Sequence, residues 1–248
     1  MRKISKTTIG KMTFLRSVLT ALFFALFGIG GFLMGILVIP VAMLFSREHA
    51  ISALGTSWKL FVWGLEFFRL IKLEKKNLNP SRRGVVIAAN HPTLLDIVFL
   101  MSSYENSICI VKGSLLHNIF LRFIVRRIFI PTKEFDVSAI DKAASAIKSG
   151  INVIIFPEGT RSDNPRRKIY SGAARISLKA NCPVVPVRIT CDPLILGKTS
   201  NPLSVSNRTV KFALEEFPLI FPESRPDLSN ARKSRLLTSK ISEILKLK

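Results

Sequence analysis

The sequence predicts an α/β fold, a mostly parallel sheet flanked by helices, preceded by an N-terminal membrane-associated helical segment. Residues 17–46 carry no charged side chain and exceed the roughly 20 residues that a helix needs to cross a bilayer. From residue 81 onward, short runs rich in Val and Ile alternate with helical stretches. This alternation is typical of a parallel sheet covered on both faces. We therefore expect a membrane anchor over residues 1–75 and an α/β domain over residues 76–248.

The expected strands are short apolar runs, and the expected helices lie between them. The strands are predicted at residues 85–89, 108–112, 128–130, 153–156, 184–189 and 210–214. The helices are predicted at residues 93–103, 115–127, 139–148 and 172–180. Proline-rich loops are expected at residues 198–208 and 217–230, before a basic amphipathic helix at residues 228–247. That last helix either packs on the domain or makes a second membrane contact.

The N-terminal segment combines a basic start with a long apolar run. Residues 1–16 hold Arg2, Lys3, Lys6, Lys11 and Arg16 and no acidic residue, which favours a cytoplasmic N-terminus. A cleaved signal peptide is the competing interpretation, but the run is long and lacks a clear cleavage site with small residues.

The run is interrupted by small residues and a proline, at Gly28, Gly30, Gly31, Gly35 and Pro40. There a helix could bend into a hairpin that enters and leaves on one side. A single span and an interfacial helix remain alternatives. Residues 57–71 are rich in aromatics beside charges and suit either the headgroup level or ordinary packing on the core.

The net charge limits the partners of the chain. There are 37 Lys and Arg residues against 16 Asp and Glu residues, which gives a net charge of +21. Such a surface attracts anionic lipid headgroups, acidic carrier proteins, phosphorylated substrates or nucleic acid. Nucleic acid is disfavoured because the basic residues are scattered. The cysteines Cys109, Cys182 and Cys191 lie far apart, which argues for a reducing compartment and against a disulfide framework or a zinc site.

The segment NHPTLLD, residues 90–96, is the first candidate for chemistry. His91 follows an apolar strand, at the end of the strand where open α/β sheets bind ligands. Asp96 is expected about one turn inside the following helix, facing His91. Its carboxylate could then orient the imidazole and stabilise the imidazolium. Because no serine stands in a nucleophile elbow, the simplest chemistry uses a substrate hydroxyl as nucleophile and His91 as its general base. The alternative is a helix cap with a surface ion pair.

The segment FPEGTRS, residues 156–162, is the second candidate. It follows another strand and offers free backbone N–H groups at Gly159 and Thr160, a hydroxyl, and the guanidinium of Arg161, which suit a phosphate. Glu158 would orient Arg161 or bind a hydroxyl of the acceptor. The alternative is a β-turn with a local Glu and Arg pair.

These segments together resemble the glycerolipid acyltransferase family, which includes bacterial 1-acylglycerol-3-phosphate acyltransferases. NHPTLLD resembles the first motif of the family, FPEGTRS the third, and VVPVRI at residues 184–189 the fourth. The resemblance covers residues 80–215. It implies a glycerolipid acyltransferase-like fold, catalysis by His91 and Asp96, and an acyl-CoA or acyl carrier protein donor without a further cofactor or metal.

The resemblance has a gap in the second motif. The comparable stretch is IFIPT, residues 128–132, and Thr132 stands where the family usually has an Arg for the phosphate of the acceptor. Lys133 or Arg127 could substitute, and Lys112 falls where the family has another basic stretch. The default acceptor is 1-acyl-sn-glycerol-3-phosphate (lysophosphatidic acid), giving phosphatidic acid, and another lysolipid or a glycolipid is the alternative. His49 and His117 are expected to be structural.

Two further functions compete with acyl transfer. A hydrolase would release the acyl group to water, and a non-enzymatic protein would use its basic surface to tether anionic partners to the bilayer. On the preferred hypothesis the catalytic domain lies on the cytoplasmic face of the inner membrane. The sequence leaves the oligomeric state open.

Overall fold

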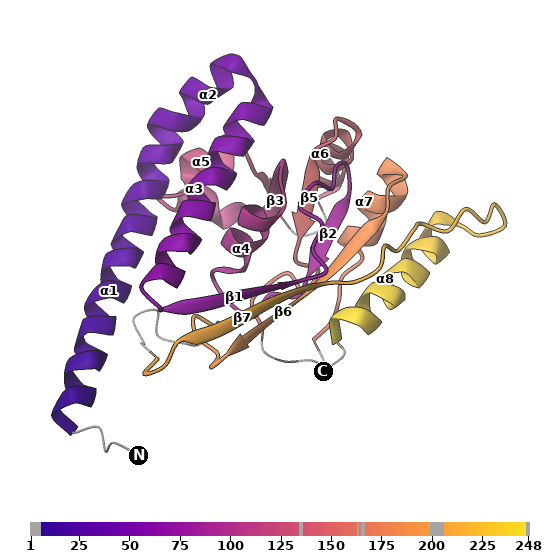
Figure 1. The fold of residues 1–248 in the computed structure, drawn as a ribbon. Helices are drawn as coiled ribbons and strands as arrows, with labels where there is room; N and C mark the ends of the chain where they lie inside the picture. Colours follow the sequence, from indigo (N-terminus) through magenta and orange to yellow (C-terminus); the bar gives the residue numbers. More distant parts are fainter. Residues whose placement is uncertain (1–5, 134–135, 163, 165–166, 199–205, 247–248) are drawn as a thin grey trace.

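The structure is a computed structural model that describes residues 6–133, 136–162, 164, 167–198 and 206–246 (Figure 1). Seven strands form one sheet in the order β1-β7-β6-β2-β5-β3-β4. Their bounds are Ile71–Lys76 (β1), Val86–Ala89 (β2), Ser107–Lys112 (β3), Ile130–Thr132 (β4), Asn152–Ile155 (β5), Val184–Asp192 (β6) and Val210–Glu216 (β7). All neighbouring strands are parallel except β6 and β7. The predicted mostly parallel α/β sheet is confirmed.

The strand β2 lies at the centre of the sheet and pairs with both β5 and β6. Ile87 is opposite Ile154 on one side and Val185 on the other. Because these strands are parallel, the residues that follow β2 and β5 emerge at the same edge of the sheet. We call this edge, where His91 and Glu158 lie, the carboxyl edge.

Helices cover both faces of the sheet. On one face α6 (Val137–Lys148), α7 (Gly172–Ala180) and α8 (Asn230–Lys246) pack in a row (Figure 1). On the other face α4 (Asp96–Ser103) lies between the sheet and the N-terminal helices. The start of α6 follows from its N-cap, because the Asp136 side chain accepts hydrogen bonds from the N–H groups of Ser138 and Ala139.

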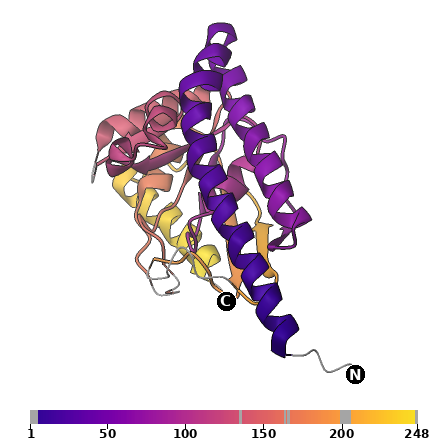
Figure 2. The same cartoon turned by 90° about the vertical axis from the view of Figure 1, so that its left-hand side faces the viewer.

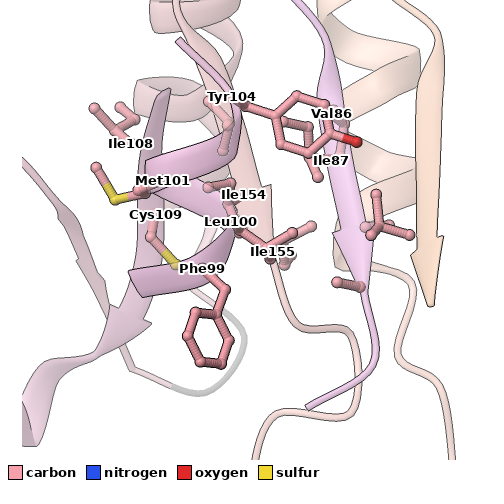
Figure 3. Packing of buried hydrophobic residues seen from close by; sticks show 14 of the residues in the cluster. Val86, Ile87, Phe99, Leu100, Met101, Tyr104, Ile108, Cys109, Ile154 and Ile155 are labelled. Atoms are coloured by element: carbon pink, nitrogen blue, oxygen red, sulfur yellow. The ribbon is translucent and has the colours of Figure 1, made fainter. Parts of the chain in front are cut away.

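One part of the core lies between α4 and the central strands (Figure 3). Phe99 and Leu100 of α4 are fully buried, as are Ile87 and Ile154 of the sheet. A strand buried on both faces has apolar residues at every position, and β2 therefore reads as a continuous apolar run.

The N-terminal segment forms a long helix and a returning helix. α1 (Lys6–Leu33), a π-helical stretch η1 (Met34–Val38) and α2 (Ile39–Phe45) continue one another. Ser46 has an extended backbone and caps α3 (Arg47–Phe67), which returns beside α1 (Figures 1 and 2). A hairpin is therefore present, but its turn lies at Ser46 and not among the glycines or at Pro40.

The glycines of this segment instead allow close packing. A Cβ at Gly35 would lie 2.8 Å from the Cβ of Phe123 and 3.3 Å from the backbone nitrogen of Ile124, both in α5 (Arg122–Arg127). Gly31 similarly faces Leu121. Small residues let the backbones of two elements approach closely, and here they dock the long helix on the domain.

One described helical stretch, Phe14–Phe45, is long and apolar enough to cross a membrane. Few of its side chains are buried in the domain, and many are exposed, with Phe14 72% and Leu44 83% exposed. An exposed apolar surface of this extent marks a membrane or protein contact, which agrees with the expected membrane association.

Arg16, which lies at the beginning of the apolar run of α1, forms hydrogen bonds to the domain. Its Nε donates to the carbonyl oxygen of Ser206 at 3.0 Å, and its Nη2 donates to that of Arg208 at 2.9 Å. Weaker contacts reach the carbonyl oxygens of Arg69 and Leu70. The beginning of the apolar run and the first and last strands of the chain therefore lie together.

Several expected boundaries shift. The strand β1 was not predicted because charged residues fill it, which suits an edge strand that pairs only with β7. It crosses the expected domain boundary at residue 75. The predicted helix at residues 115–127 is divided into a 3-10 turn η2 (Gly113–His117) and the short helix α5. Within the predicted loop at residues 198–208, residues 199–205 lie outside the described residues.

Candidate active site

The side chains of His91 and Asp96 meet at the carboxyl edge of β2. Nδ1 of His91 lies 2.7 Å from Oδ2 of Asp96. Because a carboxylate only accepts hydrogen bonds, Nδ1 carries the proton and Nε2 of the neutral imidazole is left with a free lone pair. Asp96 is fully buried, whereas the His91 side chain is 19% exposed. The predicted contact is therefore present, and Nε2 is available as a base.

Asp96 is held from a second direction by Thr93. The backbone N–H of Thr93 donates to Oδ2 at 2.7 Å, and its hydroxyl donates to Oδ1 at 2.5 Å. These bonds occupy both carboxylate oxygens, which fixes the orientation of the group. Asp96 was expected one turn inside the helix, but it is the first residue of α4. Residues 93–95 form a turn because Asp96 reaches back to the Thr93 N–H and stabilises the chain before the helix.

Phe156 packs against the imidazole. The two rings are stacked, with centroids 4.1 Å apart and an interplanar angle of 17°. Phe156 directly follows β5, so the third motif supplies the surface on which the histidine of the first motif rests. This role of Phe156 was not predicted from the sequence. The feature of the sequence that could have indicated this role is the position of Phe156 directly after the strand that pairs with β2.

The two motifs are also joined through their backbones. The N–H of Ser162 donates to the carbonyl oxygen of His91 at 2.8 Å. Asn90 forms a paired contact with β6, because its Nδ2 donates to the Ile189 carbonyl at 2.8 Å and its Oδ1 accepts from the Ile189 N–H at 2.6 Å. Asn90 thus extends the sheet by one residue beyond β2 and sets the direction in which His91 leaves the strand. Asn90 belongs to the first motif, but this role was not predicted from the sequence.

Glu158 lies against the first motif and not against Arg161. Its Oε1 accepts a long hydrogen bond, 3.4 Å, from the His91 N–H, while its Oε2 is buried without a partner in the described structure. Burial raises the pKa of this carboxyl from 4.5 to about 7, although the His91 N–H and the charge of Arg167 oppose the rise. A protonated carboxyl at neutral pH suits an Oε2 atom that no donor satisfies.

The turn after Glu158 has the backbone that glycine favours. Gly159 has a φ of 69°, and its N–H closes the turn on the carbonyl oxygen of Phe156 at 2.9 Å. The prediction that this N–H is free for a phosphate is therefore wrong. Thr160 follows, half-buried. Arg161 donates from Nη1 to the carbonyl oxygens of Leu196 at 3.0 Å and Gly197 at 3.2 Å. One donor of Arg161 therefore fixes the segment after β6, and the other donors have no partner among the described residues.

The remaining basic candidate, Lys112, ends β3 and is exposed. It lies opposite Thr132 in the parallel pairing of β3 and β4. The Thr132 hydroxyl donates to the carbonyl oxygen of Lys133 at 2.8 Å. Lys112 and Thr132 share the carboxyl edge with His91, but β5 lies between β2 and the strand of Lys112, and both β5 and β3 lie between β2 and Thr132.

An apolar pocket opens beside the first motif. Phe23 and Phe27 of α1 and Leu65 of α3 line one side, and Leu94 and Leu95 line the other. Leu94 and Leu95 lie between His91 and Asp96 in the sequence. Leu196, whose carbonyl oxygen receives Arg161, also borders this pocket. A lipid chain in this pocket would touch both the N-terminal helices α1 and α3 and the segment that contains the catalytic dyad, His91 and Asp96.

These features define an α/β protein with an imidazole base at the carboxyl edge of its sheet. Within the described part of the chain, no side-chain hydroxyl or thiol is hydrogen-bonded to His91. The dyad can therefore activate a hydroxyl brought by a substrate, which is the arrangement of an acyl-transfer site without a covalent enzyme intermediate.

Residues 70–190 match the model of the acyltransferase family, which agrees with the resemblance of the first and third motifs. The chain is 28% identical over 161 residues to a chloroplastic 1-acyl-sn-glycerol-3-phosphate acyltransferase of Brassica napus. The aligned region covers 60% of this chain and 46% of the relative. It is 30% identical over 142 residues to 1-acyl-sn-glycerol-3-phosphate acyltransferase beta of Homo sapiens, covering 51% of this chain and 49% of the relative. The chain thus spans about half the length of these curated relatives.

The fold has a solved counterpart. The crystal structure of PlsC, the 1-acyl-sn-glycerophosphate (LPA) acyltransferase of Thermotoga maritima, superposes with a TM-score of 0.66 at 20% identity, covering 95% of this chain and 99% of that chain. The shared fold therefore includes the N-terminal helices as well as the sheet.

Proposed function

We propose that this protein is an O-acyltransferase that moves a fatty acyl group from acyl-CoA or an acyl carrier protein to a hydroxyl of a lysolipid. The observation that carries the proposal is the 2.7 Å contact between His91 Nδ1 and Asp96 Oδ2, beside an apolar pocket. The default acceptor is 1-acyl-sn-glycerol-3-phosphate, the molecule in the names of the relatives. Because Thr132 stands where the family usually has an arginine for the phosphate, another lysolipid or a glycolipid is the alternative acceptor.

The mechanism follows from the free lone pair of His91. Nε2 takes the proton of the acceptor hydroxyl, and the oxygen attacks the thioester carbonyl, forming the new C–O bond of a tetrahedral intermediate. Asp96 stabilises the imidazolium. The C–S bond then breaks, and the imidazolium returns its proton to the leaving thiolate. The reaction needs no further cofactor or metal in this scheme, because the thioester supplies the leaving group.

The phosphate of the acceptor is proposed to bind at the turn of the third motif. Thr160 offers a backbone N–H group, Gly159 gives the turn its shape, and Arg161 keeps donors beyond the one that holds Leu196 and Gly197. Lys112, which ends β3, is a further candidate for binding the phosphate, although β3 lies two positions from β2 in the sheet. The high pKa of Glu158 supports its place here, since a neutral carboxyl donates a hydrogen bond and does not repel an anion.

The apolar pocket is proposed to hold a fatty chain. Its aromatic and leucine side chains come from the membrane helices and from residues 94–95. A chain placed there would extend from the bilayer toward His91. This arrangement would let a substrate react without leaving the membrane completely.

The domain is proposed to lie on the cytoplasmic face of the membrane. The contacts of Arg16 with Ser206 and Arg208 support placing the N-terminus and the α/β domain on the same side. The basic start favours the cytoplasm for that side. Anionic headgroups would then bind the positively charged surface.

The test is an assay of the purified full-length protein in nanodiscs. Acyl-CoA or acyl carrier protein is supplied with a panel of lysolipids, and the products are identified by mass spectrometry. We expect an esterified lipid, and we expect His91→Ala to abolish its formation. Free fatty acid as the main product would identify a hydrolase. Product formation that survives His91→Ala would exclude the proposed mechanism.

A further inference from the structure

A second pocket lies beside the dyad, on the side toward β6 and α8. We call it the cationic pocket. The residues of its lining used below are Asn90, Glu158, Arg167, Arg188 and Lys246. They come from the first motif, the third motif and the loop after it, β6, and the last turn of α8. This pocket is distinct from the apolar pocket, with which it shares no lining residue.

The cationic pocket has an excess of positive charge. Arg167 and Lys246 have no hydrogen bond or ion pair from their charged groups among the described residues, and Glu158 is the acidic residue of the lining. Because burial raises the pKa of Glu158 to about 7, its negative charge is reduced at neutral pH. Unpaired cations in a concave site favour the binding of an anion.

Arg188 forms one wall and is fixed in place. Its Nη2 donates to the carbonyl oxygen of Ile244 at 2.9 Å, and its guanidinium lies over the ring of Phe217 at 4.6 Å. Glu215 forms a salt bridge with its Nη1 at 3.9 Å, which is too long for a hydrogen bond. The Nε of Arg188 is buried without a partner in the described structure. Arg188 thus ties α8 to β6, and its Nε keeps an unused hydrogen-bond donor.

The two pockets flank the same short segment. Asn90 and Pro92, the neighbours of His91, line the cationic pocket, whereas Leu94 and Leu95 line the apolar pocket. A molecule with an apolar chain at one end and a phosphate at the other would therefore place its middle near His91. Acyl thioesters and phosphate-bearing lysolipids both have this form.

We propose that the cationic pocket binds a phosphate group of one substrate, through Arg167 and Lys246 against the fixed wall of Arg188. The inference rests on the proposed acyl transfer and adds a second anion site, separate from the turn at Gly159 and Arg161. The phosphate belongs to the phosphopantetheine arm of the donor if the acceptor phosphate occupies the turn of the third motif, or to the headgroup of the acceptor if that headgroup binds here and not at the turn. Charge-assisted hydrogen bonds to phosphate account for the affinity in both cases.

The test compares a pocket variant with a matched control. Arg167→Gln with Lys246→Gln removes two charges from the pocket, and Arg232→Gln with Arg235→Gln removes two from exposed positions of α8 outside it. Arg188 is kept because it also holds α8. Binding of CoA, of sn-glycerol 3-phosphate and of phosphate-free pantetheine to the full-length protein in nanodiscs is measured by calorimetry.

We expect the pocket variant to bind one of the two phosphate probes at least about tenfold more weakly, and the control variant to bind it as the wild type does. Weaker CoA binding assigns the phosphate to the donor, and weaker sn-glycerol 3-phosphate binding assigns it to the acceptor. Unchanged binding of both probes, an equal loss in the control, or no binding of either probe to the wild type would overturn the proposal. An equal loss for pantetheine would also overturn it, because phosphate would not be what is recognised.

Because binding is measured without turnover, this test does not depend on the activity assay. A protein that binds phosphate through Arg167 and Lys246 but transfers no acyl group would retain the anion site and disprove the proposed function. In an active protein, the KM of the assigned substrate should rise in the pocket variant while kcat stays near that of the wild type.

Discussion

Phe156 lies flat against the His91 imidazole, with ring centroids 4.1 Å apart. Asp96 holds the ring by one atom, and Phe156 restricts its tilt, so both contacts contribute to the direction of Nε2. We expect Phe156→Ala to lower kcat about tenfold or more, because the imidazole gains freedom to rotate away from the acceptor hydroxyl. Phe156→Tyr, which keeps the stacked ring, should retain most of the activity. Equal loss in both variants would mean that ring stacking is not the cause.

Asp96→Asn tests the orienting carboxylate with little change in shape. The amide can still accept from Thr93, but it no longer stabilises the imidazolium and favours the wrong tautomer. We expect kcat to fall by about 10²- to 10⁴-fold with a smaller change in KM. Steady-state kinetics of the purified variant measures this, and a thermal melt controls for folding. Near-normal turnover would remove Asp96 from the mechanism.

Glu158 should make the stability of the protein depend on pH. The folded protein retains this proton up to a pH of about 7, whereas the unfolded chain loses it near 4.5. The folded state therefore binds more protons in this window, and the free energy of unfolding falls as the pH rises through it, by at most about 3 kcal/mol.

Glu158→Gln remains neutral and should remove this contribution. The Tm of the variant relative to the wild type should increase steadily from pH 5 to pH 8, as measured by thermal melts in nanodiscs. Using the difference between the two proteins cancels the titration of other groups. Parallel curves of Tm against pH would show that Glu158 is ionised in the folded protein.

Arg161→Ala and Arg161→Lys separate two roles of one side chain. Nη1 fixes the carbonyl oxygens of Leu196 and Gly197, and the remaining donors are proposed to bind phosphate. Both variants should raise the KM of a phosphorylated acceptor, by about tenfold for Ala, and the lysine variant should be less impaired because it keeps the charge. An unchanged KM in Arg161→Ala would limit this residue to its structural contacts.

The packing of the long N-terminal helix can be tested with two glycines. A Cβ at Gly35 would meet Phe123 at 2.8 Å, whereas a Cβ at Gly30 meets nothing within 4 Å. Gly35→Ala should therefore destabilise the protein by about 1–3 kcal/mol through overpacking. Gly30→Ala, with the same gain in helix propensity, should be neutral or stabilising. Thermal melts of both variants measure the difference, and equal Tm values would show that the helix does not dock at Gly35.

The sequence was sufficient to predict the central sheet because its strands are buried on both faces. Every residue of β2 and β5 is buried, and all but Asn152 are apolar. A continuous apolar run in the sequence therefore predicts each strand. The edge strand β1 escaped prediction because Lys72, Glu74, Lys75 and Lys76 face solvent or one neighbour only. Its position depends on pairing with β7, which is distant in the sequence.

The dyad was also predictable, since a spacing of five residues after a strand brings His91 and Asp96 together. The contacts that orient these two side chains could not be predicted from the sequence. Asn90 pairs with Ile189, and Phe156 stacks on His91, because β6 and β5 flank β2. The order of strands is a property of the whole sheet. The turn of the hairpin was similarly misplaced, because Gly31 and Gly35 face α5, a partner that the local sequence does not reveal.

The shared lining of the apolar pocket has a practical consequence for handling the protein. Phe23, Phe27 and Leu65 belong to the segment that a biochemist would remove to obtain a water-soluble fragment, yet they complete the pocket whose other side is formed by Leu94 and Leu95. A fragment that starts at β1 would keep His91 and Asp96 but lose half of the enclosure for the fatty chain. Inactivity of such a fragment would therefore say nothing against the catalytic dyad.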